Sequence, residues 1–345
     1  MSRQRRRPQR IYVTDCEGPL SRNDNAQELA AHFIPSGAEF FARLSRYDDF
    51  LADVARRPGY NAGDTLRLLA PFLVAFGAGD AAVVEYSAEN VLLVPGARAL
   101  LAELRALLPT FIISTSYTPY IRALCAVTGF PFEDCRCTTL SLDTWRLDAA
   151  EAAWLRDWAR RVVERPVIDI PGRAVSTDDL SPRDRETVAE LDRLFWEEMA
   201  GKTSGELLTA VKPVGGHRKL AALQEIVAEC RGTGHDVMYV GDSITDAPPL
   251  SAVREWGGVS LSFNGNGYAL AAAEFAAAGA DVAPVLALAR AFASGGARAV
   301  REAAQRWRSS VAGMVGVVAE DREVLTAASI AARKSVRGER VARLG

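Results

Sequence analysis

The stretch that decides the fold is residues 10–20, which read RIYVTDCEGPL. Residues 11–13 are apolar and rich in β-formers, so they predict a short buried strand, which Gly18 and the proline after it bring to an end. Asp15 and Glu17 come directly after this strand. In an open parallel sheet, ligands bind at the carboxyl ends of the strands, and two acids spaced by one residue on extended backbone can face one crevice. The alternative is a strand end that carries two solvated acids.

Length and composition indicate an ordinary globular protein. The chain has 345 residues, of which 49% are hydrophobic and 24% are charged, enough for two modules or for one α/β domain with large insertions. Its 41 basic and 43 acidic residues give a net charge of −2, so no overall field attracts nucleic acid or an anionic membrane. Neither is therefore an expected partner. The arginine-rich residues 1–9 predict a disordered basic start.

Targeting and cysteine patterns favour a cytoplasmic protein. No apolar export segment follows the first arginines, because the next apolar residues belong to the strand before Asp15. The apolar stretch 268–293 is interrupted by charged residues, which argues against a membrane span. Five cysteines, an odd number, do not describe a disulfide framework. Cys135 and Cys137 lack a second pair at zinc-ligand spacing, so we expect thiols within a strand.

Alternating strand and helix patterns predict the core of the fold. The closing third of the chain reads as helix 217–230, strand 237–240, helix 246–254, strand 258–263 and helix 268–278. A helix over 97–108 likewise precedes a strand over 110–113. Such alternation implies a parallel sheet with right-handed crossovers and helices on both faces. The predicted class is therefore α/β, a three-layer Rossmann-like parallel sheet, with its core in residues 10–20, 95–130 and 213–290.

The remaining segments predict insertions into this core. Residues 21–94 contain several amphipathic pieces and are expected to form a helical cap inserted after the first strand. Residues 131–212 predict a second insertion of uncertain form, with strand-like patterns at 138–142 and 167–170. Residues 291–345 predict C-terminal helices that pack against the sheet or against another subunit, so a homodimer is one expectation.

Polar residues follow three of the predicted strands. They are, in chain order, Asp15 with Glu17, Ser114 with Thr115, and Asp242 with Asp246. Because parallel strands end at the same edge of a sheet, these groups are expected to converge although they are far apart in the chain. Paired carboxylates suit phosphoryl chemistry, since one can attack phosphorus and bind a cation while the other moves protons.

A phosphate group beside these acids needs compensating positive charge. Asp242 and Asp246 can hold a hard cation such as Mg²⁺, or orient water or an ammonium. Lys219, near the start of the helix that precedes Asp242, can contact both the phosphoryl oxygens and a nucleophile, and Lys212 is its competitor. Ser114 adds a hydroxyl donor, which N–H groups at the start of the following helix reinforce.

These motifs resemble those of the haloacid dehalogenase-like (HAD) phosphohydrolases. That family has an apolar strand running into Asp-x-Asp, which DCEGP at 15–19 matches in part, and a Ser or Thr after a strand, which Ser114 matches. Its acidic pair matches GDSITD at 241–246, and the spacing from Lys219 to that pair is similar to that of the phosphoserine phosphatase branch. The string TDCEGPL also resembles an archaeal-type subgroup of predicted hydrolases, some of them named for an energy-converting hydrogenase subunit.

The resemblance implies roles for the matched residues. Asp15 would be the nucleophile that forms an aspartyl-phosphate, and Glu17 would protonate the leaving group and then activate water. Glu17 stands where the family commonly has a second Asp, and Ser-Thr-Ser at 114–116 replaces a common Ser-Gly-Gly. The implied metal ligands are Asp15, Glu17 through its backbone carbonyl, Asp242 and Asp246; the implied phosphate-binding residues are Ser114, Thr115 and Lys219.

The resemblance extends to the cap and to the substrate. Asp24 falls close to where phosphoserine phosphatase-like enzymes place a carboxylate for the substrate amine, and Arg67 resembles the cap arginine that binds the substrate carboxylate. A solvated side chain is the alternative for Arg67. The expected function is Mg²⁺-dependent hydrolysis of a small phosphorylated metabolite. Alternatives are phosphoryl transfer to a small alcohol, and a non-catalytic subunit of a hydrogenase or other complex that keeps this fold.

Overall fold

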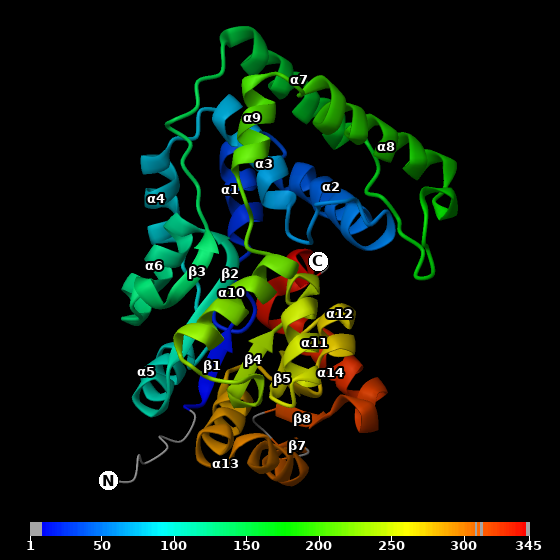
Figure 1. Cartoon of the computed structure of the whole chain (residues 1–345). Helices are drawn as coiled ribbons and strands as arrows, with labels where there is room; N and C mark the ends of the chain where they lie inside the picture. The colour runs from blue at the N-terminus through cyan, green and yellow to red at the C-terminus, as the bar shows by residue number, and fades with distance from the viewer. Residues whose placement is uncertain (1–8, 308, 311–312, 343–345) are drawn as a thin grey trace.

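The structure is a computed structural model that describes residues 9–307, 309–310 and 313–342. Figure 1 shows a group of helices, the cap, stacked on one edge of an α/β core. The predicted disordered start over residues 1–9 lies outside the described residues except for its last position.

One sheet forms the centre of the core, with the strand order β3-β2-β1-β4-β5-β6-β8-β7. The strands are β1 Ile11–Thr14, β2 Thr110–Tyr117, β3 Cys135–Thr138, β4 Val237–Gly241, β5 Val259–Phe263, β6 Phe275–Ala278, β7 Ser309–Ser310 and β8 Gly313–Val317. Those from β3 to β6 run parallel, and β8 and β7 are antiparallel to their neighbours. Thr14 in β1 pairs with Ile112 on one side and Val240 on the other, which sets the ends of β1 and β4 side by side while β2 continues beyond them to Tyr117.

Helices cover both faces of this sheet. Tyr12 and Met238 point to one face and pack with helices α5 Ala97–Leu107, α6 Thr118–Thr128 and α13 Ala283–Trp307. Val13 and Tyr239 point to the other and pack with α10 His217–Glu229, α11 Ala247–Glu255 and α12 Gly267–Ala272. Because successive strand residues face opposite layers, the fully buried run in β1 serves both of them. The predicted three-layer α/β class with a helical cap after the first strand is confirmed.

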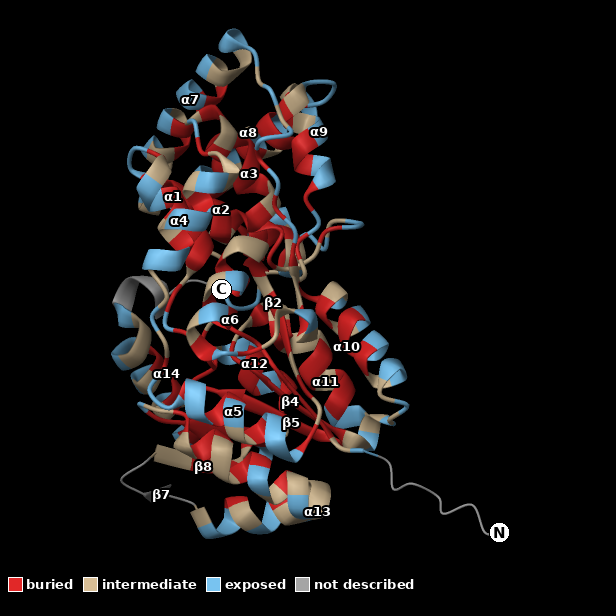
Figure 2. Cartoon of the chain, turned by 90° about the vertical axis from the view of Figure 1, so that its left-hand side faces the viewer, coloured by how far each residue is buried: buried red, intermediate tan, exposed pale blue. Residues whose placement is uncertain are grey.

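The cap is built from two separate parts of the chain. After β1 come α1 Asn25–Phe33, α2 Gly37–Asp49, the π-helical turn η1 Phe50–Val54, α3 Thr65–Ala75 and α4 Asp80–Glu89; after β3 come α7 Ala149–Glu164, α8 Pro182–Asp192, the π-helical turn η4 Arg193–Glu198 and α9 Thr203–Ala210. Large side chains from both parts, among them Phe40, Phe72, Trp158 and Phe195, belong to one hydrophobic cluster. Figure 2 shows this buried interior above the buried layers of the sheet. The second insertion therefore completes the cap.

The end of the chain returns to the junction between cap and core. Helix α14, Val318–Ala342, is interrupted at Asp321 and at Gly338 and packs on β6 and β8, where Leu325 is buried. Its last turns lie between the cap and the sheet in Figure 1, drawn in red. Among the described residues no single helix has the length and apolar character needed to cross a bilayer. Helices α3 and α4 have that length and character only when taken together, and the pair is bent by 115°.

Two predicted helical stretches contain strands. Of the predicted helix 268–278, only its start is helical in α12, and residues 275–278 form β6. Alanine has the highest helix propensity, but here the pairing of β6 with β5 on one side and β8 on the other overrides it. The expectation of helices throughout 291–345 is likewise wrong at β8, whose GMVGV sequence pairs antiparallel with β6.

The strand patterns within the second insertion are also wrong. The strand predicted over 138–142 is displaced: β3 begins earlier, at Cys135, and ends at Thr138. Residues 167–170 have no regular secondary structure. Ile168 is buried in the cap, and its carbonyl accepts a hydrogen bond from an arginine side chain of α2, Arg46 Nε, at 3.3 Å.

Candidate active site

The loop after β1 carries the first acid into the junction between core and cap. Asp15 continues the pairing of β1, since its N–H donates to the Val240 carbonyl at 2.8 Å. The chain then turns sharply at Gly18, whose φ of +96° lies in the left-handed region that favours glycine. A Cβ at Gly18 would collide with the carboxylate of Asp242. This close backbone approach brings the loop of β1 against the loop of β4.

Asp246 organises the loop after β4. Its Oδ2 accepts hydrogen bonds from the N–H groups of Asp242 and Ser243, at 3.1 and 3.2 Å. Its Oδ1 accepts from the Tyr239 hydroxyl at 2.8 Å and from Lys219 Nζ at 2.7 Å. Asp246 is fully buried, and protein donors occupy both of its carboxylate oxygens. Its position suits holding the loop and the lysine in place.

Lys219 reaches this loop from the first turn of α10. Its ammonium has no exposed surface and lies 2.8 Å from Asp15 Oδ2 as well as 2.7 Å from Asp246 Oδ1. Burial acts to lower the pKa of Lys219, but the charges of Asp15 and Asp246 outweigh it and raise the pKa, so the side chain is a cation. Burial raises the pKa of Asp246 as well, but Lys219 outweighs it and the net shift is downward. The structure thus places the motif lysine between two motif acids.

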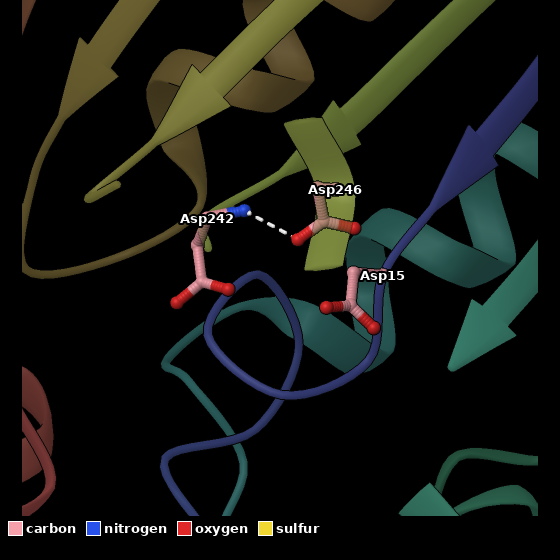
Figure 3. A group of neighbouring side chains, drawn as sticks. All are labelled: Asp15, Asp242 and Asp246. Carbon is pink, nitrogen blue, oxygen red and sulfur yellow. Dashed lines mark hydrogen bonds between the residues drawn. The ribbon is translucent and has the colours of Figure 1, made fainter. Parts of the chain in front are cut away.

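Three of the predicted acids form a group that fits a metal ion. Asp15, Asp242 and Asp246 are buried, and each offers a carboxylate oxygen within 4.8 Å of the others. Figure 3 shows them converging from the ends of β1 and β4. All the donors are hard oxygens, the ligands that Mg²⁺ prefers. Asp246 accepts at least two protein donors on each oxygen, whereas Asp15 accepts one on each, from the Cys16 N–H at 2.7 Å and from Lys219 Nζ at 2.8 Å. Asp15 therefore has more lone pairs left for a metal than Asp246.

Glu17 points away from this acidic group. It is half-buried, and its Oε1 accepts a hydrogen bond from the Asn25 N–H, at the start of the cap, at 2.8 Å. Removal of water and then the charge of Asp24 raise the pKa of Glu17 to about 8, although Arg337 opposes this shift. At neutral pH Glu17 therefore carries a proton that it can donate. Its carboxylate is not among the three grouped acids, and a metal contact through its backbone carbonyl stays a prediction.

The predicted hydroxyl donors lie within β2 rather than after it, because the strand continues to Tyr117, across a register shift against β3 between Ile113 and Tyr117. Ser114 is buried, and its Oγ bonds the hydroxyl and the N–H of Ser116, at 3.1 and 3.2 Å. The Thr115 Oγ1 is buried and has no hydrogen-bond partner among the described residues. An unpaired buried hydroxyl costs free energy unless a ligand satisfies it, so Thr115 points to a group that binds there.

These residues surround a cavity of about 110 Å³ between the strand ends and the cap. The walls are strongly acidic, and the cap supplies acids that the sequence did not single out. The residues that line it are Asp15, Glu17, Asp24, Phe41, Ser45, Asp48, Asp49, Gly63, Thr65, Leu66, Ser114, Thr115, Asp242, Ser243, Ile244, Thr245, Arg333 and Arg337. Burial, followed by the charge of Asp49, raises the pKa of Asp48 to about 8.

The two predicted substrate residues have different positions. Asp24 lines the cavity, where its Oδ1 also caps α1 by accepting from the Gln27 N–H at 3.1 Å. Arg67 is not among the lining residues. Its guanidinium lies 3.0 Å from Asp64 Oδ2 and over the ring of Tyr60, at 4.9 Å from the centroid. The structure therefore brings Asp24 to the other acids and leaves Arg67 inside the cap.

Two arginines of α14 enter the site from a segment that the sequence did not connect with it. Arg333 and Arg337 both contact Asp242 Oδ2, and the contact of Arg337 measures 3.1 Å. Arg337 Nη2 also donates to the Asn23 carbonyl at 2.6 Å. These residues lie 91 and 95 positions after Asp242, so no local pattern could relate them. The one available signal is their spacing of four, which puts both on one helix face.

Comparison with known proteins shows where this architecture recurs. The chain is similar to a solved structure of gene product AF1437 from Archaeoglobus fulgidus, with 29% identity, a TM-score of 0.84, and coverage of 98% of this chain and 99% of that one. A weaker likeness is to a HAD family hydrolase from Salmonella enterica serovar Typhi, with 11% identity, a TM-score of 0.43, and coverage of 76% of this chain and 65% of that one. Another is to an apo phosphoserine phosphatase, with 12% identity, a TM-score of 0.42, and coverage of 77% of this chain and 92% of that one. No family model and no curated protein matches the sequence.

Proposed function

We propose that this protein is a HAD-like phosphatase that hydrolyses a small phosphorylated metabolite with Mg²⁺ as its cofactor. The observation that carries this proposal is the position of Lys219, in contact with Asp15 and Asp246 at the edge of the sheet where Asp242 also lies. A carboxylate nucleophile, a buried ammonium, a hydroxyl donor and a protonated acid are the groups that hydrolysis through an aspartyl-phosphate needs.

The first step forms the covalent intermediate. Asp15 attacks phosphorus, an Asp15–phosphorus bond forms, and the ester bond to the leaving oxygen breaks. Glu17 gives its proton to that oxygen, so the alcohol leaves neutral and Glu17 becomes a carboxylate. The Lys219 ammonium, 2.8 Å from Asp15, and the unpartnered hydroxyl of Thr115 donate to the phosphoryl oxygens as charge shifts onto them.

The second step regenerates the enzyme. Glu17, now ionised, takes a proton from water while the water oxygen bonds to phosphorus. The bond from phosphorus to Asp15 then breaks and inorganic phosphate leaves. If a small alcohol takes the place of water, the same residues transfer the phosphoryl group instead, so analysis of the products separates hydrolysis from transfer.

The acids of the site account for the proposed metal. Asp15 and Asp242, with the backbone carbonyl of Glu17, would hold Mg²⁺, and Asp246 would orient the loop that presents Asp242. When bound, Mg²⁺ neutralises charge on the phosphoryl oxygens and on the acids around them. The hard oxygen donors support Mg²⁺ over softer metals.

The cavity supports a small substrate. At about 110 Å³ it accommodates a phosphoryl group with a short leaving group. Asp24 in its wall is available for a substrate amine, as in phosphoserine phosphatase-like enzymes. Arg67 forms no part of this proposal, because its guanidinium pairs with Asp64 inside the cap.

The test is hydrolysis of p-nitrophenyl phosphate and of a panel of small phosphometabolites, with and without Mg²⁺. Activity that requires Mg²⁺ and disappears in Asp15→Asn supports the proposal. Asp178→Asn, which alters an exposed acid of the second insertion, is the matched control and should keep full activity. Full activity in Asp15→Asn would contradict the proposal. A protein that is inactive on the whole panel would instead favour a non-catalytic subunit.

A further inference from the structure

Helix α14 places two guanidinium groups in the wall of the cavity. Arg333 and Arg337 are one helical turn apart, and their side chains are 5% and 6% exposed. Lys334 beside them is exposed to solvent. Burial of a guanidinium is costly unless anions surround it. The burial of these two cations therefore indicates that anions lie around them.

The protein's own acids supply some of the negative charge around the two arginines. Both arginines contact the same oxygen of Asp242, and the charge of Asp24 also acts on both. Arg337 reaches the Asn23 carbonyl through Nη2, while its Nε is buried and has no hydrogen-bond partner among the described residues. A guanidinium offers five N–H donors in a planar fork that matches carboxylate and phosphate oxygens. Arg337 thus keeps a donor for a ligand in the cavity that it lines.

The arginines and Lys219 contact different acids of the same group: the arginines contact Asp242, whereas Lys219 contacts the other two. Lys219 contacts Asp15 and Asp246, where the proposed function puts the reacting phosphoryl group. Arg337 contacts Asn23, in the chain that leads from β1 into the cap, and its charge acts on Glu17, the proposed proton donor to the leaving group. A group bound to Arg337 would therefore belong to the leaving part of the substrate.

We propose that Arg333 and Arg337 bind a second anionic group, a carboxylate or a phosphate, on the leaving part of the substrate. The substrate class is then a short phosphomonoester with one further oxyanion, and α14 is a specificity element. This assignment rests on the proposed function for its distinction between the reacting and the leaving part. The presence of an anion-binding pair in the cavity does not depend on turnover, so binding alone can test it.

The probes are phosphonates, which this chemistry does not hydrolyse. Alkylphosphonates carry one anionic group, whereas ω-carboxyalkylphosphonates and α,ω-bisphosphonates of one to three methylenes carry a second. Calorimetry at one fixed concentration of free Mg²⁺ measures their affinities for the full-length protein. We expect at least one two-anion ligand to bind about 10- to 100-fold more tightly than the alkylphosphonate of equal length, because its second anion gains a charge-assisted hydrogen bond that the alkylphosphonate lacks. The carboxylate and bisphosphonate series distinguish the two anions.

Variants of α14 show whether the arginines cause that difference. Arg333→Gln and Arg337→Gln should each remove most of the advantage of the two-anion ligand over the alkylphosphonate of equal length. Lys334→Gln, which removes an exposed charge one position from Arg333, should keep the wild-type difference. If circular dichroism shows that a Gln variant is unfolded, Arg337→Lys is the second variant. It keeps the positive charge but loses the planar guanidinium, and should retain part of the affinity advantage of the two-anion ligand.

Three results would overturn this inference: no two-anion ligand binds better than its alkylphosphonate, the advantage persists in both arginine variants, or removal of the arginines tightens binding. The last would mean that α14 blocks the cavity. Failure of the second-anion site can be distinguished from failure of the proposed function. Arg-dependent binding without phosphatase activity would retain the second-anion site and reject the phosphatase, whereas activity with Arg-independent binding would do the reverse.

Discussion

The ammonium of Lys219 lies 2.8 Å from the carboxylate of Asp15, although the two residues come from segments that are far apart in the chain. Both groups are buried, and Asp246 holds the lysine from its other side at 2.7 Å. Burial penalises the charged form of both acids, and Lys219 opposes that penalty: the pKa of Asp15 still lies above its ordinary value, chiefly through burial, whereas the pKa of Asp246 lies below it. The stability of the site and its chemistry therefore depend on the same contact.

Replacement of Lys219 should damage both properties. Lys219→Met leaves Asp15 and Asp246 buried without their shared cation, so we expect a loss of about 3–5 kcal/mol in the free energy of unfolding, measured by urea titration in EDTA. Phosphatase activity should fall to background. Lys212→Met is the matched control, because Lys212 is exposed, and it should be close to wild type. The assignment of the motif lysine is wrong if Lys212→Met loses activity and Lys219→Met keeps it.

Removal of the Thr115 hydroxyl should separate binding from stability. Because Oγ1 of Thr115 is buried without a protein partner, Thr115→Val should leave the thermal midpoint unchanged or raise it, while kcat/KM falls about tenfold. The contrasting variant is Thr138→Val. Thr138 Oγ1 donates to the Thr115 carbonyl at 2.5 Å and accepts from the Val214 N–H at 2.9 Å, so its loss should cost about 1–3 kcal/mol of stability. An unchanged kcat/KM in Thr115→Val would remove this hydroxyl from the phosphate site.

A methyl group at Gly18 should affect the site more than the fold. Gly18 and Gly59 both have positive φ, +96° and +75°, so alanine at either position costs about 1–2 kcal/mol of backbone strain. A Cβ at Gly59 meets open space, whereas one at Gly18 collides with Asp242. We therefore expect Gly59→Ala to lose stability and keep its activity, and Gly18→Ala to lose Mg²⁺-dependent activity as well. Equal kinetics in the two variants would show that the loops of β1 and β4 need no close contact.

The buried acid Asp48 should make stability depend on pH. Burial and the charge of Asp49 raise the pKa of Asp48 to about 8 from an ordinary value of 3.8, so between these values the folded protein holds a proton that the unfolded chain has lost. This contribution to stability is complete below about pH 4 and disappears as pH rises through 8. Asp48→Asn should thus flatten the fall in thermal midpoint between pH 5 and pH 8, whereas the exposed Asp178→Asn should not. An identical slope in Asp48→Asn and wild type would show that Asp48 does not hold that proton.

The parts that the sequence predicted are those with a local signal. β1 is a short apolar run bounded by a turn, β4 ends in a Gly-Asp motif, and α10 repeats its apolar residues at helical spacing, so each could be placed by pattern alone. The meeting of their ends followed from one rule about parallel sheets. The grouping of Asp15, Asp242 and Asp246 was accessible for this reason.

The parts that the sequence missed depend on contacts between distant segments. The alanines of β6 pair with strands on both sides, which outweighs their preference for helix. Arg333 and Arg337 enter the site because α14 packs on β6 and β8, and nothing near them in sequence indicates that packing. Asp48 and Asp49 reach the cavity through the tertiary fold of the cap, in a helix that reads as an ordinary amphipathic one.

Asp15 is the proposed nucleophile, and trapping of the intermediate tests this role most directly. The enzyme is mixed with a good phosphomonoester and Mg²⁺, quenched in acid within one turnover, reduced with borohydride and digested for mass spectrometry. An aspartyl-phosphate at Asp15 would appear as homoserine at position 15, absent without substrate and absent in Asp15→Asn. Turnover that proceeds with reduction at another carboxylate, or with none at position 15, would contradict the account.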